Sequence, residues 1–191
     1  MDAAPIGPSL EPGTLLIAGA GLSDGVFDEA VVLLLDVDEA GALGVVVNRF
    51  ADMELAHALP GWDDVVSIPH RLHDGGPVAQ EGAICLASPL LDGDEPPGWR
   101  RLFSTIGLLH LQTPLELVEG AYRDVRIFAG YAGWGPGQLE GELAGDLWYP
   151  VRGTYSDVFD ADPESLWRRI LRRQPGELGW LATWTSTPEL N

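Results

Sequence analysis

The sequence contains no lysine, so all 11 of its basic residues are arginines. Enzymes that form a Schiff base or use pyridoxal phosphate need the ε-amine of a lysine, and the phosphate-binding P-loop needs its lysine as well. The missing amine therefore excludes these classes of enzyme.

Basic charge of any kind is scarce. The 11 arginines stand against 29 acidic residues, which leaves a formal net charge of -18. Such a charge repels the phosphate backbone of nucleic acids and the anionic surface of membranes. We therefore expect neither nucleic acid nor a membrane to be a partner.

Cysteine and long apolar runs are scarce too. The single Cys85 has no second cysteine with which to form an internal disulfide, and no basic-then-apolar signal segment precedes the first apolar run. No stretch approaches the ~18 consecutive apolar residues of a membrane-spanning helix. The expected location is therefore the cytoplasm.

What the sequence does contain is enough apolar material for one folded domain. Its 191 residues are 46% hydrophobic, and a chain of this length can bury roughly 70% of its unfolded surface. Pro5, Pro8 and Pro12 disfavour helix and sheet near the start, so residues 1–12 are predicted to be a flexible N-terminal arm. Residues 13–191 are predicted to form a single domain.

Aliphatic runs separated by turn residues predict a series of strands. Residues 31–35 and 43–47 flank the polar, glycine-bearing segment 36–41 and are predicted to pair as a hairpin of two buried strands. Further strands are expected at residues 14–18, 83–87, 106–111, 125–129 and 147–151.

Short helices are predicted between these strands, at residues 53–59, 114–119, 138–144 and 163–174. Asp52 is expected to cap the first of them, and Thr113 with Glu116 matches the pattern of a capping box at the second. Because strands and short helices alternate irregularly, the sequence predicts an α+β fold with a mixed sheet rather than a doubly wound fold.

No complete catalytic constellation stands out. The segment 21–25 matches the spacing of a serine nucleophile elbow, but only one predicted strand precedes it, so no second oxyanion donor lies upstream. His70 and His73 lack a third metal ligand at a recognisable spacing, so solvent-facing histidines are expected. Cys85 lies in an apolar strand, where a buried and inert thiol is usual. No catalytic residue, metal site or cofactor is predicted.

The segment 130–140, Gly-Tyr-Ala-Gly-Trp-Gly-Pro-Gly-Gln-Leu-Glu, is the most informative of the chain. Its glycines permit positive φ and close backbone approach, and its Tyr and Trp offer amphipathic contact area. One interpretation is a tight strand-to-helix connection whose Trp134 fills the core. The other is a contact surface for a ligand or partner, formed by Tyr131, Gly133, Trp134, Gly135, Gly137, Gln138 and Glu140.

The same segment carries a resemblance to a known family. Gly130–Glu142 followed by Trp148 resembles the signature of the YqgE/AlgH family. Other segments resemble the family in the same order: Leu16–Ala18 with Asp24 and Phe27, Gly41–Asn48, Gly75–Val78, Leu166-Trp167 and Leu190-Asn191. The similarity covers residues 13–191 and thus the whole predicted domain.

The resemblance implies a fold but no activity. The family's fold is described as a mixed, bifurcated sheet or small barrel surrounded by short helices, and its biochemical activity is not established. Some members carry the label of transcriptional regulator. In this sequence the net charge of -18 and the lack of a helix-turn-helix pattern oppose DNA binding.

Three hypotheses about function remain open. The first is a non-catalytic binding or regulatory module that acts through a protein partner or a small-molecule ligand at residues 130–140. The second is an enzyme that uses carboxylates such as Glu140 or Glu142, with or without a divalent metal. The third is a transcriptional regulator, which the net charge disfavours.

Overall fold

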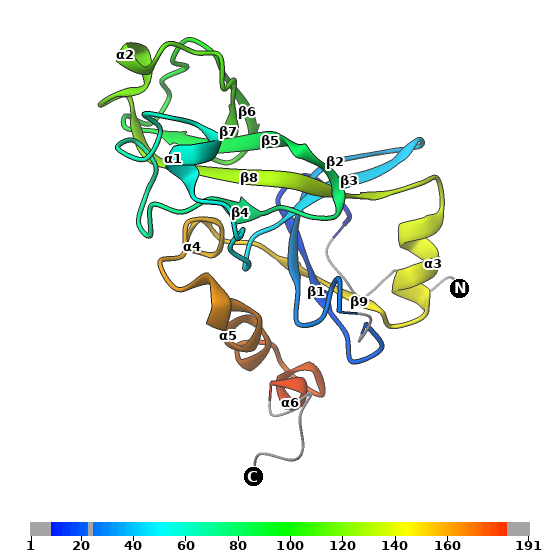
Figure 1. The fold of residues 1–191 in the computed structure, drawn as a ribbon. Helices are drawn as coiled ribbons and strands as arrows, with labels where there is room; N and C mark the ends of the chain where they lie inside the picture. Colours follow the sequence, from blue (N-terminus) through cyan, green and yellow to red (C-terminus); the bar gives the residue numbers. More distant parts are fainter. Residues whose placement is uncertain (1–8, 23–24, 183–191) are drawn as a thin grey trace.

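The computed structural model describes residues 9–22 and 25–182 (Figure 1). Its strands are β1 (Thr14–Ala18), β2 (Val31–Asp38), β3 (Gly41–Val46), β4 (His73–Asp74), β5 (Val78–Pro89), β6 (Trp99–Phe103), β7 (Ile106–Leu109), β8 (Tyr122–Trp134) and β9 (Trp148–Arg152). Its helices are α1 (Leu55–Ala58), α2 (Leu115–Val118), α3 (Gln138–Ala144), α4 (Tyr155–Val158), α5 (Leu166–Arg172) and α6 (Leu178–Leu181), and a 3-10 turn covers Pro163–Ser165.

The described strands form one curled sheet with the order β6-β7-β5-β8-β3-β2-β1-β9, and β4 lies beside β8 off this path. The pair of β4 and β8 is parallel, whereas β8 pairs with β3 and with β5 in the antiparallel sense. The sheet is therefore mixed and branches at β8, and short helices surround it (Figure 1). The predicted α+β class is confirmed.

Every strand that the sequence predicts is present. The strands β2 and β3 form the expected hairpin, in which Val32 lies opposite Val46 and Leu33 opposite Val45. The elements β4, β6, α4 and α6 were not predicted from the sequence because each is short or lacks a regular apolar pattern. Strands β5 and β8 are longer than predicted.

Alternate residues of the strands point to opposite faces of the sheet and build separate apolar clusters. On one face, Leu15 packs with Trp167 of α5. On the opposite face, Leu16 packs with Leu139 of α3 at one end of the sheet, and Ile127 belongs to the cluster that α1 and α2 cover at the other end. One face of the sheet thus carries two separate helical covers, α3 and the α1–α2 pair (Figure 1).

Strand β8 passes through the middle of the sheet and contains the start of the predicted glycine-rich connection. The expectation that the strand ends at Ala129 is wrong, because residues 132–134 continue it by pairing with residues 42–44 of β3. Gly130, with a φ of 69°, interrupts the alternation of side chains. Ala129 and Ala132 therefore both belong to clusters on the face opposite α5.

Two predicted helix caps are wrong. Asp52 does not cap α1, which begins at Leu55 with Glu54 in the N-cap position and no capping side chain. Pro114, which holds an extended ψ, takes the N-cap position of α2, so that helix begins one residue too late for Thr113 and Glu116 to form a capping box. A capping box is found at α4 instead.

The predicted amphipathic helix at α5 is confirmed. Leu166, Trp167, Ile170 and Leu171 are its buried residues. The indole of Trp167 donates a hydrogen bond of 2.9 Å to the carbonyl oxygen of Ala18 and so ties α5 to the end of β1.

Several sequence expectations concern residues outside the described ranges. Residues 1–8 of the predicted arm, Ser23 and Asp24 of the elbow-like segment, and Leu190-Asn191 are among them. Within the described part of the arm, Leu10 packs against the cluster under α3. In the described ranges, no helix is both long enough and apolar enough to cross a membrane.

Candidate functional site

The signature segment 130–142 closes one end of the sheet. The indole N–H groups of Trp134 and Trp148 both donate to Oε2 of Glu142 at 2.8 Å, and the Gln138 amide donates to Oε1 of the same carboxylate at 2.9 Å. The two indole rings meet edge to face with their centroids 5.8 Å apart. A buried N–H group that lacks an acceptor costs free energy. Because Glu142 of α3 accepts from Trp134 of β8 and Trp148 of β9, it stabilises the packing of α3 on the sheet.

The structure separates the residues that were predicted to form a contact surface. Trp134 is buried in the cluster under α3, whereas the half-buried Tyr131 packs with the α5 cluster on the opposite face. The exposed members are Gly133, Gly135, Gly137, Gln138 and Glu140. The two aromatic rings therefore do not share a surface, and the contact role of the exposed residues stays a prediction.

The thiol and one imidazole that the sequence singled out lie inside the protein. Cys85 is buried, and desolvation raises the pKa of its thiol far above the usual value. His73 lies between the rings of Phe50 and Phe128 and is fully buried, so the expectation that it faces solvent is wrong. The reason is its place in β4, directly beside β8. Burial, together with the positive charge of Arg126, lowers the pKa of His73 to about 3, so its ring is neutral.

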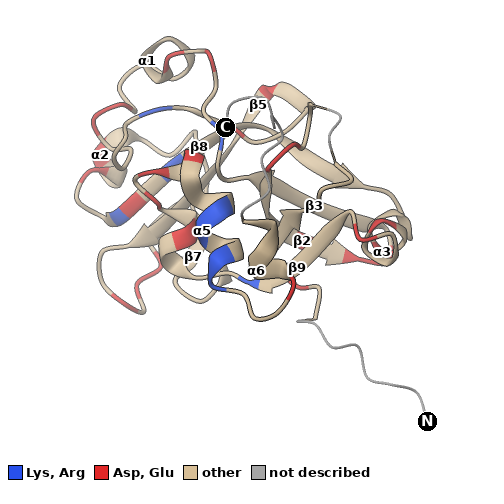
Figure 2. Ribbon diagram, turned by 90° about the horizontal axis from the view of Figure 1, so that it is seen from below, with Lys and Arg blue, Asp and Glu red and all other residues tan. Residues whose placement is uncertain are grey.

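Arginines are concentrated on α5 (Figure 2), and three of those on and next to this helix are paired with carboxylates. Arg168 lies 2.8 Å from Glu29, and Arg169 pairs with two aspartates before the 3-10 turn. Arg173 binds Asp157 through hydrogen bonds of 2.9 and 2.5 Å. Burial alone raises the pKa of Asp157, but its hydrogen bonds outweigh this effect and hold the pKa below its usual value. These three arginines are therefore already neutralised within the fold.

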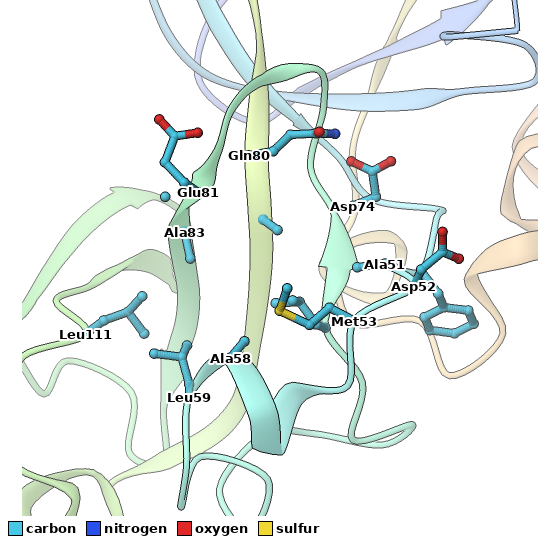
Figure 3. A pocket seen from close by; sticks show the side chains of 14 residues that line it. Ala51, Asp52, Met53, Ala58, Leu59, Asp74, Gln80, Glu81, Ala83 and Leu111 are labelled. Atoms are coloured by element: carbon cyan, nitrogen blue, oxygen red, sulfur yellow. The ribbon is translucent and has the colours of Figure 1, made fainter.

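The end of the sheet under α1 contains a cavity of about 730 Å³, which we call the main cavity (Figure 3). Its floor includes Ala83 of β5 and Ala129 of β8, which pair directly across the two strands. The next pair on the same face, Cys85 and Ile127, lies in the filled core under α1 and α2. The cavity begins where methyl groups replace these larger side chains, and Ala58 of α1 adds a further methyl group to its lining.

Three carboxylates surround this apolar floor. Asp52 precedes α1 and Asp74 ends β4, whereas Glu81 lies in β5 on the other side of β8 (Figure 3). Of the residues that the structure describes, no basic side chain lines the main cavity. Among the described residues, no ion pair uses any of these three carboxylates. The rim therefore carries uncompensated negative charge above an apolar surface.

The position of Glu81 depends on Gly130. Residues 79–82 of β5 bulge out opposite this single residue of β8. A β-carbon on Gly130 would lie 2.4 Å from the carbonyl oxygen of Gly76, and the φ of 69° is one that other residues rarely adopt. The first glycine of the signature segment therefore shapes the rim of the main cavity.

The rim carboxylates do not converge on one point. Within the part of the chain that the structure describes, no group of three or more His, Cys, Asp or Glu side chains is placed to hold a metal ion. An ammonium or guanidinium group can be held by a single carboxylate, and its carbon skeleton gains from an apolar floor. The arrangement thus suits an organic cation better than a metal ion.

The model of a family described as AlgH-like matches residues 15–179 of the chain. The chain belongs to the AlgH-like family. The resemblance seen in the signature segment is thereby confirmed. This AlgH-like chain is 48% identical to a UPF0301 protein of Streptomyces avermitilis, over 94% of each chain. It is 42% identical to a UPF0301 protein of Thermobifida fusca, again over 94% of each.

Solved structures show the same fold as this AlgH-like chain. A crystal structure of a protein from Corynebacterium diphtheriae has a TM-score of 0.86 and 26% sequence identity, and the match covers 93% of this chain and 94% of the other. The solution structure of the AlgH protein from Pseudomonas aeruginosa has a TM-score of 0.69 and 24% identity, with 98% and 100% covered. The second likeness concerns the fold alone.

The main cavity of this AlgH-like chain was not predicted from the sequence. Its lining comes from separated segments, which only the pairing of β5 with β8 and the position of α1 bring together. Scattered carboxylates and alanines are common on any acidic protein, so they give no motif. The one usable signal was the alanine at each of positions 83 and 129, because an apolar strand usually carries larger side chains there.

Proposed function

We propose that this AlgH-like protein is a non-catalytic binding module whose ligand is an organic cation with an apolar body, held in the main cavity. The observation that carries the proposal is an alanine-lined floor with three carboxylates at its rim and, among the described residues, no basic side chain in the lining. The volume of about 730 Å³ lies in the range usual for small-ligand sites.

The charge of the whole molecule supports a cationic ligand. A net charge of -18 attracts cations over the surface and concentrates them at an apolar concavity with an acidic rim. An amine or guanidinium at the rim gains charge-assisted hydrogen bonds from Asp52, Asp74 or Glu81. A carboxylate or phosphate ligand meets only repulsion there.

The positions of the reactive groups support a role without catalysis. Both oxygens of Glu142 accept hydrogen bonds from side chains of the fold, which leaves the carboxylate poorly placed to exchange protons with a substrate. The Cys85 thiol and the His73 ring are buried and are not among the described residues that line the main cavity. These observations favour the binding module over the enzyme hypothesis.

The internal ion pairs beside α5 argue against DNA as the ligand. Arg168, Arg169 and Arg173 would have to leave their carboxylates before they met phosphates. A cytoplasmic location remains part of the proposal, and a lone, buried Cys85 is compatible with a reducing compartment.

The proposal is tested by titrating the protein with benzylamine and phenethylamine and with benzoate and phenylacetate, which match them in shape but carry the opposite charge. Backbone NMR shifts report where each compound binds. We expect the amines to shift signals of Ala83, Ala129 and Leu111, and the carboxylates to shift none of them. Equal effects of amines and carboxylates, or shifts elsewhere only, would contradict the proposal.

Variants sharpen this test. Ala83 is exposed and lines the floor, so Ala83→Leu should fill the main cavity and abolish amine binding without disturbing the core. Asp74→Asn should weaken binding several-fold by removing one rim charge. Glu39→Gln, in the exposed turn between β2 and β3, removes the same charge at a distance and should leave binding unchanged.

A further inference from the structure

The main cavity has a neighbour. A second cavity of about 250 Å³, which we call the adjoining cavity, shares Ala51, Asp52, Met53 and Leu72 with its lining. The chain at Asp52-Met53 is therefore a ridge between two hollows rather than the outer wall of one. An occupant that crosses this ridge would contact both.

Negative charge is present on both sides of the ridge. Beyond Asp52, the adjoining cavity is lined by Glu54 and Asp63. Its one arginine, Arg71, holds its guanidinium 4.0 Å from the centre of the Phe50 ring. The two cavities thus offer carboxylates at both ends of one surface. The adjoining cavity is also lined by His70 and by Arg71, which keeps its positive charge while it contacts the Phe50 ring.

The ridge has one large apolar side chain, that of Met53, beside the carboxylate of Asp52. Met53 is 58% exposed, although it is a large hydrophobic residue. A flexible thioether adapts its shape to different apolar partners and is frequent at surfaces that bind peptides. An occupant with an apolar centre would cover Met53 and remove it from water.

We infer that the two cavities together form a groove for an extended segment of a partner protein, with an apolar residue over Met53 and a cationic side chain in each hollow. This inference rests on the proposed function of the main cavity and names its natural occupant. A peptide fits the observations better than a small amine, because a small amine with one charge occupies the main cavity only. The excess of carboxylates over arginines in both linings disfavours an acidic segment.

The test uses fluorescein-labelled heptapeptides with a leucine centre and arginines at varied spacings on both sides. In the matched peptides one arginine is replaced by citrulline, which keeps the shape but not the charge. Fluorescence anisotropy at low salt should show that the best peptide with two arginines binds at least about tenfold more tightly than either citrulline version. Similar affinities, or no peptide binding at all, would overturn the inference.

A variant assigns the second charge to the adjoining cavity. The double substitution Glu54→Gln with Asp63→Asn should abolish the gain from the second arginine and leave benzylamine binding in the main cavity intact. The control Glu39→Gln with Glu164→Gln removes the same charge elsewhere and should keep the gain. A gain that survives in the double variant refutes the groove.

The outcomes for the two proposals are separable. Benzylamine binding without a gain from the second arginine leaves the proposed function standing and removes only the groove. Failure of benzylamine and of every peptide removes both. Circular dichroism melting curves of each variant establish that the fold persists in these comparisons.

Discussion

The two ends of the sheet face opposite α5 carry helices in different ways. At one end, α3 is held down by two indoles and a carboxylate, and its apolar side packs directly onto the sheet. At the other end, the short helix α1 stands over paired alanines and leaves a cavity of about 730 Å³. We call the end under α3 the closed end and the end with the main cavity the open end. The signature segment begins with Gly130 next to the rim of the open end and continues into α3 at the closed end.

This comparison indicates that the most recognisable motif of the protein, residues 130–142 with Trp148, mainly stabilises the fold. Trp134 and Trp148 are rare, large residues whose N–H groups must be satisfied when buried, so their sequence context is distinctive. The cavity is made from small, common residues and has no comparable motif. The motif therefore identifies residues that stabilise the fold and does not identify the residues that line the cavity.

Gly130→Ala should have the largest effect, because this residue of β8 connects the two ends. The methyl group would meet the carbonyl oxygen of Gly76 at 2.4 Å and would also have to adopt a positive φ. We expect a loss of about 4 kcal/mol in the free energy of unfolding. Urea denaturation measures the loss, and amine binding should weaken with it as the rim moves.

Gly137→Ala is the matched control for this prediction. Gly137 has a similar φ of 74°, but nothing lies within 4 Å of a β-carbon placed on it. The variant should lose about 1 kcal/mol from backbone strain alone. Equal losses in the two glycine variants would show that the bulge next to Gly130 is not under steric constraint.

Glu142→Ala tests the closed end by itself. The variant leaves the N–H groups of Trp134 and Trp148 without their acceptor, and we expect a loss of about 3 kcal/mol in the free energy of unfolding. Binding of benzylamine at the far end of the sheet should not change below the melting temperature.

Glu140→Ala provides the control on the same helix. Glu140 is exposed, and its substitution should cost at most about 0.5 kcal/mol. Equal stability of the two glutamate variants would show that the carboxylate of Glu142 does not stabilise the packing of α3 on the sheet. Loss of partner binding in the Glu140 variant alone would favour the contact surface predicted at the exposed part of this segment.

His73→Phe tests whether the buried imidazole of β4 makes the free energy of unfolding depend on pH. The pKa of His73 is about 3 in the folded protein and 6.5 in the unfolded chain. Between these two pH values the imidazole is therefore protonated in the unfolded chain and neutral in the folded protein. This residue therefore costs the wild type stability as pH falls. Between pH 7.5 and pH 5 the variant should lose about 2 kcal/mol less than the wild type.

Urea denaturation at the two pH values measures this difference. The other acid-sensitive groups are common to both proteins and cancel in the comparison. Parallel losses of stability in the variant and the wild type would mean that the buried ring of His73 is protonated or solvated in the fold.

Much of the fold was predictable because it depends on local patterns. Composition and periodicity are enough to predict the β-branched runs of β2 and β3 and the apolar face of α5. The caps at Asp52 and Thr113 were wrong because a capping pattern is only a local preference. The N-cap lies two residues later than predicted at α1 and one residue later at α2. The end of β8 was misplaced because a glycine-rich sequence resembles a loop until a partner strand pairs with it.

By itself, the sequence determined the α+β class, the family, the acidic character and the absence of lysine chemistry, because each follows from composition or from contiguous residues. The tertiary structure alone decided that Tyr131 and Trp134 face apart, that His73 is buried, and that Ala83 and Ala129 meet at the floor of a cavity. The physical reason is that a site made of residues far apart in the chain exists only when strand pairing and helix packing bring them together, and those depend on the whole fold.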